Sequence, residues 1–202
     1  MTMTGGSARL IERPEAVPLA TKVPFSFVHI NKCGGSSVEI ALGLPKRHSS
    51  AAVLRKELGA EEWARRFTFS IVRNPFDRIV SIYYYRVRTN TGGLGDRHIN
   101  INDWIEAVWG ARDPRYWENT VLLAPAWDWL CGDDGLIVDQ VAKLETIDAD
   151  WPTIAARLGV EVGLEQWNSN HHPHYRQLLT DRARAVIETA FAEDLQQFGY
   201  TY

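Results

Sequence analysis

Cysteine is scarce in this chain, with only Cys33 and Cys131 among 202 residues. Two cysteines cannot build the disulfide framework on which small secreted proteins depend. No run of eighteen apolar residues occurs, so we expect no membrane-spanning helix. The first residues also lack the charged start and the apolar core of a signal peptide. From these absences we expect a cytoplasmic protein.

Excess basic charge is lacking as well, since the formal net charge is −3. No general positive field is available to attract nucleic acid, and we therefore expect no nucleic-acid partner. The composition is otherwise ordinary for a globular protein, with 45% hydrophobic and 23% charged residues. A chain of 202 residues is long enough for one well-buried domain. Nothing in the pattern indicates an oligomeric state.

The chain divides into a lead-in and one domain. Residues 1–23 mix glycine, serine, proline and charge without a period, which is typical of a loosely tethered, flexible arm. Apolar and aromatic residues over 25–30 and 67–72 predict two buried strands, each followed by a turn and a helical pattern. This alternation predicts a single α/β domain over 24–202, with a mostly parallel central sheet flanked by helices.

The first strand runs into a glycine turn that is suited to an anion. Lys32 precedes Gly34 and Gly35 in this turn. Ser36 and Glu39 have the spacing of a capping box, so we expect a helix to begin near Ser36. Backbone N–H groups at a helix start bind anions, and glycines let a phosphate approach without a Cβ in the way. The Walker A pattern G-x-x-x-x-G-K-[ST] is absent, which disfavours a magnesium-dependent NTPase.

The second strand leads into a similar segment. Arg73 follows the strand, and Asn74 and Pro75 are typical of an N-cap and a first helical residue. Arg78 and Ser81, three residues apart, share one side of the helix that follows. Two anion-binding segments in one small domain predict a ligand that is charged at both ends.

Local signals also predict elements farther along the chain. The glycine-rich segment 89–101 is typical of a flexible surface loop and is our candidate for a lid or an acceptor-binding element. Asn102 or Asp103 is expected to cap one helix and Asp150 another. Thr180 is expected to cap the last long helix, which carries an apolar stripe.

Both anion-binding segments resemble motifs of the PAPS-dependent sulfotransferases, most closely the carbohydrate and bacterial types. Residues 27–37, F-V-H-I-N-K-C-G-G-S-S, resemble the 5′-phosphosulfate loop H-I-P-K-T-G-G-T-S. Residues 71–81, I-V-R-N-P-F-D-R-I-V-S, resemble the 3′-phosphate segment R-N-P-x-x-R-x-x-S. Residues 138–145 are similar to the family's V-D-F-V-x-R-F-E stretch, and the tail 193–200 also carries similar residues. The resemblance covers the chain from about residue 25 to its end.

The resemblance implies a P-loop-like fold and the sulfuryl donor PAPS (3′-phosphoadenosine 5′-phosphosulfate), with PAP as the product and no metal ion. The residues that it assigns to the 5′-phosphosulfate are Lys32, Cys33, Gly34, Gly35, Ser36 and Ser37. Those that it assigns to the 3′-phosphate are Arg73 and Ser81. Asn31 and Cys33 stand where the family usually has proline and threonine, residues that supply loop rigidity and a hydroxyl contact.

Two residues are our candidates for catalysis. Lys32 is suited to stabilise the negative charge that develops on the bridging oxygen as the donor's S–O bond breaks. His48 is the candidate general base, because histidine is the side chain best poised near neutral pH. The alternative for His48 is a surface histidine in a polar turn. His29 lies within the first predicted strand and is expected to be a core residue with its polar atoms satisfied.

Two weaker patterns are also present. The cluster 171–174, H-H-P-H, suggests a zinc site, but no cysteine or carboxylate pattern accompanies it. Cys33 at a helix start suggests an activated thiol, although no third group orients a Cys–His pair.

The leading hypothesis is therefore a sulfotransferase that moves a sulfuryl group from PAPS to a hydroxyl of a carbohydrate or small molecule by in-line displacement. One alternative is a PAPS- or nucleotide-binding module without turnover, and another is a nucleotide-dependent kinase or phosphotransferase. A polyanionic acceptor is expected only if six basic residues gather on one rim, namely Lys46, Arg47, Arg65, Arg66, Arg86 and Arg88.

Overall fold

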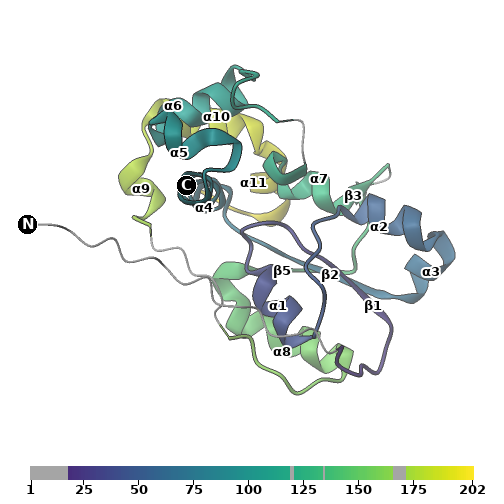
Figure 1. Ribbon diagram of the computed structural model, residues 1–202. Coiled ribbons are helices and arrows are strands. Elements are labelled where there is room, and N and C mark those ends of the chain that lie inside the picture. Colours follow the sequence, from purple (N-terminus) through teal and green to yellow (C-terminus); the bar gives the residue numbers. More distant parts are fainter. Residues whose placement is uncertain (1–17, 119–120, 134, 166–171) are drawn as a thin grey trace, which may run out of the picture.

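Three parallel strands form the centre of the computed structural model, which describes residues 18–118, 121–133, 135–165 and 172–202 (Figure 1). The sheet order is β1–β2–β5, and the strand bounds are Phe25–Val28, Phe67–Val72 and Gln140–Lys143. The register pairs Phe25 with Phe67 and Ile71 with Ala142. All six residues of β2 are buried, as expected of a central strand. The predicted α/β fold with a parallel sheet flanked by helices is confirmed.

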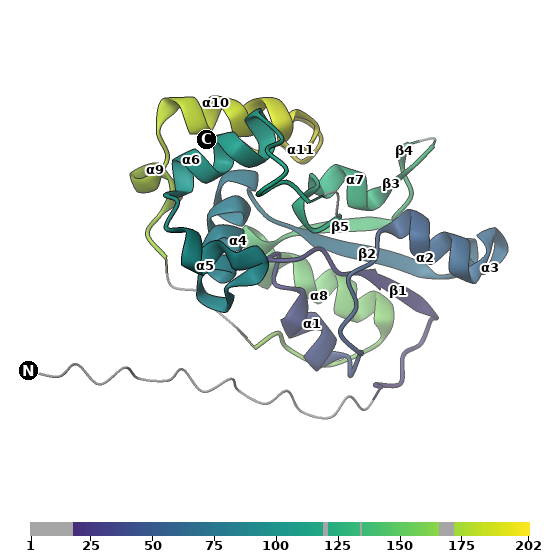
Figure 2. The same ribbon diagram turned by 45° about the horizontal axis from the view of Figure 1, so that its top comes forward.

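Alternation along the strands gives the sheet two apolar faces. Phe67, Phe69 and Ile71 point to one face, where α1 and α8 cover them (Figure 2). Val72 and Val28 point to the opposite face, beneath α2, α3 and α7. The bounds of these helices are Gly35–Ala41 for α1, Ile147–Leu158 for α8, Ala51–Leu58 for α2, Ala60–Arg65 for α3 and Ala126–Leu130 for α7.

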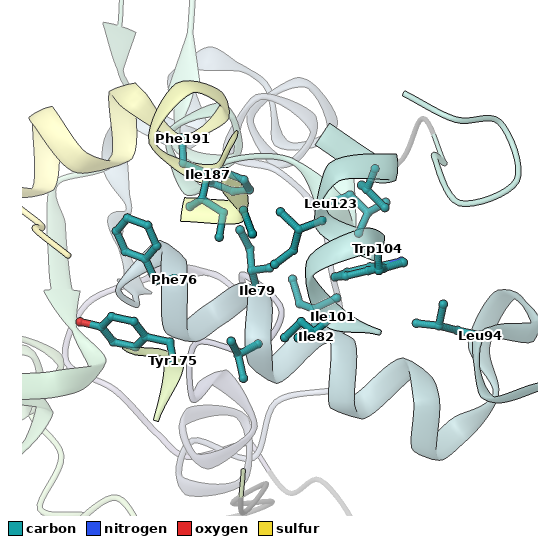
Figure 3. Packing of buried hydrophobic residues seen from close by; sticks show 14 residues of the cluster. Phe76, Ile79, Ile82, Leu94, Ile101, Trp104, Leu123, Tyr175, Ile187 and Phe191 are labelled. Atoms are coloured by element: carbon teal, nitrogen blue, oxygen red, sulfur yellow. The ribbon is translucent and has the colours of Figure 1, made fainter. Parts of the chain in front are cut away.

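A second group of helices packs around α4, the long helix after β2. Phe76, Ile79 and Ile82 of α4 meet Trp104 and Ile187 in one apolar cluster, and all five are at most 3% exposed (Figure 3). Burying a side chain of this size contributes roughly 1.5–3 kcal/mol, so the cluster anchors α4 firmly. The bounds are Pro75–Thr89 for α4, Ile101–Ile105 for α6, Glu106–Gly110 for the π-helix η2, Tyr175–Leu178 for α9, Asp181–Ala190 for α10 and Ala192–Phe198 for α11.

The segment 89–101 is not the surface loop that its glycines predict. After α4 ends, the 3₁₀ turn η1 at Thr91–Gly93 and the short helix α5 at Leu94–Arg97 fold back onto α4. Asn90 reverses the chain in the left-handed conformation, with φ at 50°, and its Nδ2 donates to Asp96 Oδ2 at 2.7 Å. The Leu94 side chain is only 4% exposed. The glycines therefore serve tight turns between short helices, and a role of this segment as a lid or an acceptor-binding element stays a prediction.

Helix starts agree with the sequence where the cap is a short polar side chain before a helical run. Thr180 caps α10 and Asn74 caps α4, as predicted. The capping box predicted for α1 is wrong, because the N-cap is Gly34 in the left-handed conformation and no side chain caps the helix. Ser36 lies inside the helix, and the Glu39 side chain is buried against a histidine, as described below.

Two further predicted caps are displaced. Asn100, and not Asn102 or Asp103, caps α6, because its side-chain oxygen accepts from the backbone N–H groups of both of those residues. Helix α8 begins before Asp150, which therefore lies inside it. The Asp150 carboxylate instead accepts from the Lys143 N–H at 3.0 Å and so ties the start of α8 to the end of β5.

Two short segments complete the description. Strands β3 at Cys131–Gly132 and β4 at Gly135–Leu136 form a small antiparallel pair. Of the predicted arm, residues 1–17 lie outside the described residues. Its last residues run along the domain, where the N–H of Leu19 donates to Leu42 O and that of Lys22 donates to Leu158 O. Within the described ranges, no helix has the length and apolar character needed to cross a membrane.

Among the described residues, Arg78 of α4 is the most deeply buried charged residue, with no exposed surface. Its guanidinium donates to three oxygens that lie in two separate loops. Nε and Nη2 donate to the backbone and side-chain oxygens of Asn31 at 3.2 and 2.8 Å, and Nη1 donates to Ala124 O at 2.8 Å. The loop after β1 and the loop before α7 are thereby held against α4.

Replacing Arg78 with methionine is expected to destabilise the protein by roughly 3 kcal/mol, because three partly buried oxygens lose their donor and two loops lose their common partner. Urea unfolding followed by circular dichroism measures this change. Arg65→Met is the matched control, since the Arg65 side chain is 68% exposed, and its effect should stay within about 0.5 kcal/mol. Equal unfolding midpoints for the two variants would contradict the role given to Arg78.

Candidate functional site

The candidate site lies at the carboxyl edge of the sheet, where the loops after β1, β2 and β5 meet. Parallel strands bring their carboxyl ends to one edge, and ligands of open α/β sheets bind there. The loop after β1 covers 29–34 and leads into α1, the loop after β2 is Arg73 and Asn74 before α4, and β5 leads into the 3₁₀ turn η4 at Leu144–Thr146 (Figure 2).

The loop after β1 is tightly turned. Lys32 has φ at 65° and Gly34 has φ at 79°, so both adopt the left-handed conformation. A non-glycine residue in this conformation is uncommon and stores strain, which is frequent at functional sites. The side chain of Cys33 between them is buried, at 1% exposure. The Cys33 thiol therefore does not face a ligand in this conformation.

Two glycines allow the loop to lie close to its neighbours. A Cβ added at Gly35 would stand 2.1 Å from Cδ2 of His29, and one added at Gly34 would stand 2.6 Å from Cδ1 of Leu144. Neither distance is possible for real atoms, so both positions require glycine in this packing. The start of α1 is thereby pressed against His29, the first residue after β1, and against Leu144 of η4.

Asn31 gives the loop the rigidity that a proline gives in the family pattern. Its Nδ2 donates to Leu122 O at 3.0 Å, and its Oδ1 accepts from Arg78 Nη2 at 2.8 Å. A second bond from Arg78 reaches the Asn31 backbone oxygen. The departure at position 31 therefore replaces a restricted backbone with three hydrogen bonds to the surrounding structure.

The two predicted anion-binding segments touch each other. Arg73 Nη1 donates to Lys32 O at 3.1 Å, while its Nε and Nη2 donate to Asp77 Oδ2 at 2.9 and 2.5 Å. Arg73 is therefore held in place between α4 and the first loop, with its charge partly balanced. Ser81, which lies two turns into α4, is only 2% exposed.

The loop after β5 braces the second segment, a role that the residue pattern alone does not predict. The Glu145 carboxylate accepts from the Asn74 N–H at 2.7 Å and from the Tyr200 hydroxyl at 2.9 Å. The Lys143 ammonium lies 4.7 Å from the centre of the Tyr200 ring. The likeness of residues 138–145 and 193–200 to family motifs was the available signal, and the structure brings these two stretches together behind Asn74.

Lys32 lies in an environment that disfavours its charge. Burial, followed by the positive charges of Arg73 and Arg88 and the smaller effect of Lys46, lowers the pKa of Lys32 from 10.5 to about 8. Its ammonium lies 4.7 Å from the centre of the Tyr85 ring. Near neutral pH the group is still mostly charged, and an anion placed beside it would raise the pKa again.

His48 lies next to the first loop and not at a remote surface. Its Nδ1 is 3.1 Å from the carbonyl oxygen of His29, and the two imidazole rings are 4.3 Å apart. A carbonyl oxygen only accepts, so Nδ1 carries the proton and Nε2 carries the lone pair of a base. Burial, and to a smaller degree His29, lowers the pKa of His48 below 6.5, so the ring is neutral at pH 7.

His29 is the buried residue that was predicted, at 4% exposure, and it joins His48 to the start of α1. Its Nδ1 lies 2.6 Å from Oε1 of Glu39, which also accepts from the Arg47 N–H at 3.0 Å. The segment that carries His48 is thus tied to α1 through Glu39 and to the loop after β1 through the His29 carbonyl.

Of the two weaker predictions, the activated thiol is contradicted, and the zinc cluster lies partly outside the described residues. Burial raises the pKa of the Cys33 thiol to about 11, which is the opposite of an activated thiol. For zinc, His171 lies outside the described residues, while His174 Nδ1 accepts from the Arg176 N–H and His172 stacks on Tyr84. No group of three or more metal-binding side chains gathers in the part of the chain that the structure describes.

Most of the six basic residues that could bind a polyanionic acceptor are already paired with carboxylates. Four of them are engaged by carboxylates: Arg47 by Glu57, Arg65 by Glu61 and Glu62, Arg66 by Glu62, and Arg86 by Glu118. Lys46 and Arg88 have no carboxylate partner among the described residues, and both act on Lys32. The condition for a polyanionic acceptor is therefore met by two side chains instead of six.

Comparison with known proteins gives one family and one solved structure. No curated protein sequence matches the chain significantly. The chain is similar to a crystal structure of a sulfotransferase from Alicyclobacillus acidocaldarius at 16% identity, with a TM-score of 0.48, over 89% of this chain and 97% of that one. The family model described as "Sulfotransferase family" matches residues 20–201. Because this match covers nearly the whole domain, the chain belongs to the sulfotransferase family.

Proposed function

We propose that the protein transfers a sulfuryl group from PAPS to a hydroxyl of a carbohydrate or small molecule and releases PAP. The observation that carries the proposal is the hydrogen bond between Arg73 Nη1 and Lys32 O, which joins the two anion-binding segments at one sheet edge. A donor charged at both ends of its nucleotide suits such a pair. Family membership supports sulfuryl transfer in general.

The residues present fit such a donor. Gly34 and Gly35 place no side chain of their own at the start of α1, which suits the close approach of a phosphate to the backbone there. In the proposal, the 5′-phosphosulfate is held by Lys32, the backbone of Cys33, Gly34 and Gly35, and the hydroxyls of Ser36 and Ser37. In the same proposal Arg73 and Ser81 hold the 3′-phosphate, and Ser81 is nearly buried in the conformation described.

Lys32 and His48 have separate roles in the proposed reaction. The reaction breaks the S–O bond to the 5′-phosphate and forms one to the acceptor oxygen, while the acceptor's proton moves to the base. Lys32 supplies positive charge beside the bridging oxygen that becomes negative. His48 Nε2 takes the proton, and the Nδ1–His29 hydrogen bond keeps the ring in the tautomer that can do so. No metal ion is needed for either task.

The direct test is incubation with PAPS and a panel of hydroxyl acceptors in the presence of EDTA, with PAP measured by chromatography. We expect PAP to form without metal and Lys32→Ala to lower the rate by about a hundredfold or more. Tight PAPS binding without PAP for every acceptor would favour a binding module. Formation of ADP from ATP that depends on magnesium would favour a kinase or phosphotransferase and would overturn the proposal.

The dependence of kcat/KM on pH should be bell-shaped. Activity needs neutral His48, whose pKa is lowered, so the rate falls only as pH drops below 6.5. Activity also needs charged Lys32, so the rate falls as pH rises through about 8. His48→Gln should slow the reaction and remove the acidic limb, and Lys32→Arg should remove the alkaline limb. A His48→Gln profile with its acidic limb intact would take His48 out of the role of base.

Gly35→Ala should weaken PAP binding by about tenfold or more, because the added Cβ must displace the His29 ring and with it the start of α1. Isothermal titration calorimetry measures the affinity, after circular dichroism has shown that the variant is folded. Gly163→Ala is the control, since no atom lies within 4 Å of a Cβ added there. Unchanged PAP affinity in folded Gly35→Ala would show that this helix start does not hold the donor.

A further inference from the structure

Tyr85 is an exposed aromatic residue whose ring contacts charge instead of the core. It lies on α4 and is 36% exposed. The Lys32 ammonium is 4.7 Å from the ring centre, and the Arg88 guanidinium carbon is 5.8 Å from it. Both are within the distance at which a cation is attracted to the negative face of an aromatic ring.

The position of Tyr85 on α4 follows from helical spacing. Arg78, Ser81, Tyr85 and Arg88 are separated by three, four and three residues, so they form one stripe along the helix. At the start of this stripe, Arg78 bonds both oxygens of Asn31. Two turns later, Tyr85 meets the side chain of Lys32. One face of α4 therefore holds two consecutive residues of the first loop.

The Lys32 backbone is already fixed, so the contact with Tyr85 determines where its charged end lies. The backbone is in the left-handed conformation, with φ at 65°, and its carbonyl accepts from Arg73. What remains free is the four-carbon side chain, whose end carries the charge that the reaction needs. A lysine on a flexible stem loses rotamer freedom when it is held, and a ring face holds it without a formal charge.

The groups that face Lys32 explain why a neutral aromatic partner suits it. Arg73 comes from the end of β2, Arg88 from α4 and Lys46 from the segment before His48, and all three are positive. The neighbouring Cys33 is a neutral thiol, since its pKa is raised to about 11. A carboxylate at the position of Tyr85 would hold the ammonium too, but it would also repel an anionic donor. The ring face stabilises the ammonium and leaves the field of the site positive.

We propose that Tyr85 is a positioning residue, whose ring face holds the Lys32 ammonium charged and directed along α4 before the donor binds. The proposal rests on the proposed function for its catalytic meaning, but the contact itself can be tested without turnover. The contact is with the ring face and does not need the Tyr85 hydroxyl, so Tyr85→Phe should keep the position and charge of the Lys32 ammonium.

The test is the pKa of Lys32 in the full chain, measured by NMR of ¹³C-dimethylated lysines over a pH titration. The protein has five lysines, and Lys32→Arg identifies the signal. Tyr85→Leu should lower the pKa of Lys32 by about half to one pH unit, because the charged form loses its aromatic partner. Tyr85→Phe should leave it unchanged. Arg88→Gln should raise it, because a repelling charge is removed.

Tyr84→Leu is the matched control, because the Tyr84 ring stacks on His172 and not on a lysine. In the PAPS assay, Tyr85→Leu should lower kcat by roughly three- to tenfold and move the alkaline limb to lower pH, with a smaller effect on the KM for PAPS. Tyr85→Phe should retain both the rate and the limb.

The result that overturns the proposal is a Lys32 pKa in Tyr85→Leu equal to that of the unmodified sequence. An equal fall in Tyr85→Phe and Tyr85→Leu would also overturn it, because the hydroxyl and not the ring face would then be the partner. If no acceptor is ever sulfated, the proposed function fails, while the pKa measurement still decides the role of Tyr85.

Discussion

The arrangement of the site depends on one buried guanidinium. Arg78 has no exposed surface and donates to Asn31 and Ala124, so it holds the loop after β1 against the helix after β2. A buried charge must be fully bonded to be tolerated, and the three oxygens meet that requirement only when both loops are in place. The geometry that brings Lys32 to Arg73 follows from this constraint.

Arg73, Lys32 and Asn74 each have a partner at the site, but Lys32 is not paired with a carboxylate in the part of the chain that the structure describes. Arg73 is paired with Asp77, Lys32 faces the ring of Tyr85, and Asn74 is braced by Glu145 behind the site. Of the six basic residues considered for a polyanionic acceptor, four form ion pairs with carboxylates, namely Arg47, Arg65, Arg66 and Arg86. The positive charges of Arg73, Arg88 and Lys46 all act on Lys32 at the sheet edge, and such a local group of charges suits a small anionic ligand better than a long polyanion.

Features set by local chemistry were predictable from the sequence, and features set by distant partners were not. The strand 67–72 follows from its apolar run, and the caps Asn74 and Thr180 follow from short polar side chains before a helical pattern. The bonds that make Asn31 rigid are not visible in the sequence, because the partner Leu122 lies 91 residues away in the chain. The glycines of 89–101 predict a loop, because they are visible locally whereas the burial of Leu94 is not. The contacts of Glu145, Tyr200 and Tyr85 are not predictable from the sequence for the same reason.

The central claim is that the two joined segments bind a nucleotide carrying phosphate at both ends. Calorimetric titration in EDTA of adenosine 3′,5′-bisphosphate (PAP) against adenosine 5′-monophosphate tests it most directly. The account predicts that PAP binds about a hundredfold tighter or more, because only PAP engages Arg73 as well as the start of α1. Equal affinity for the two nucleotides, or binding of PAP that requires magnesium, would contradict it.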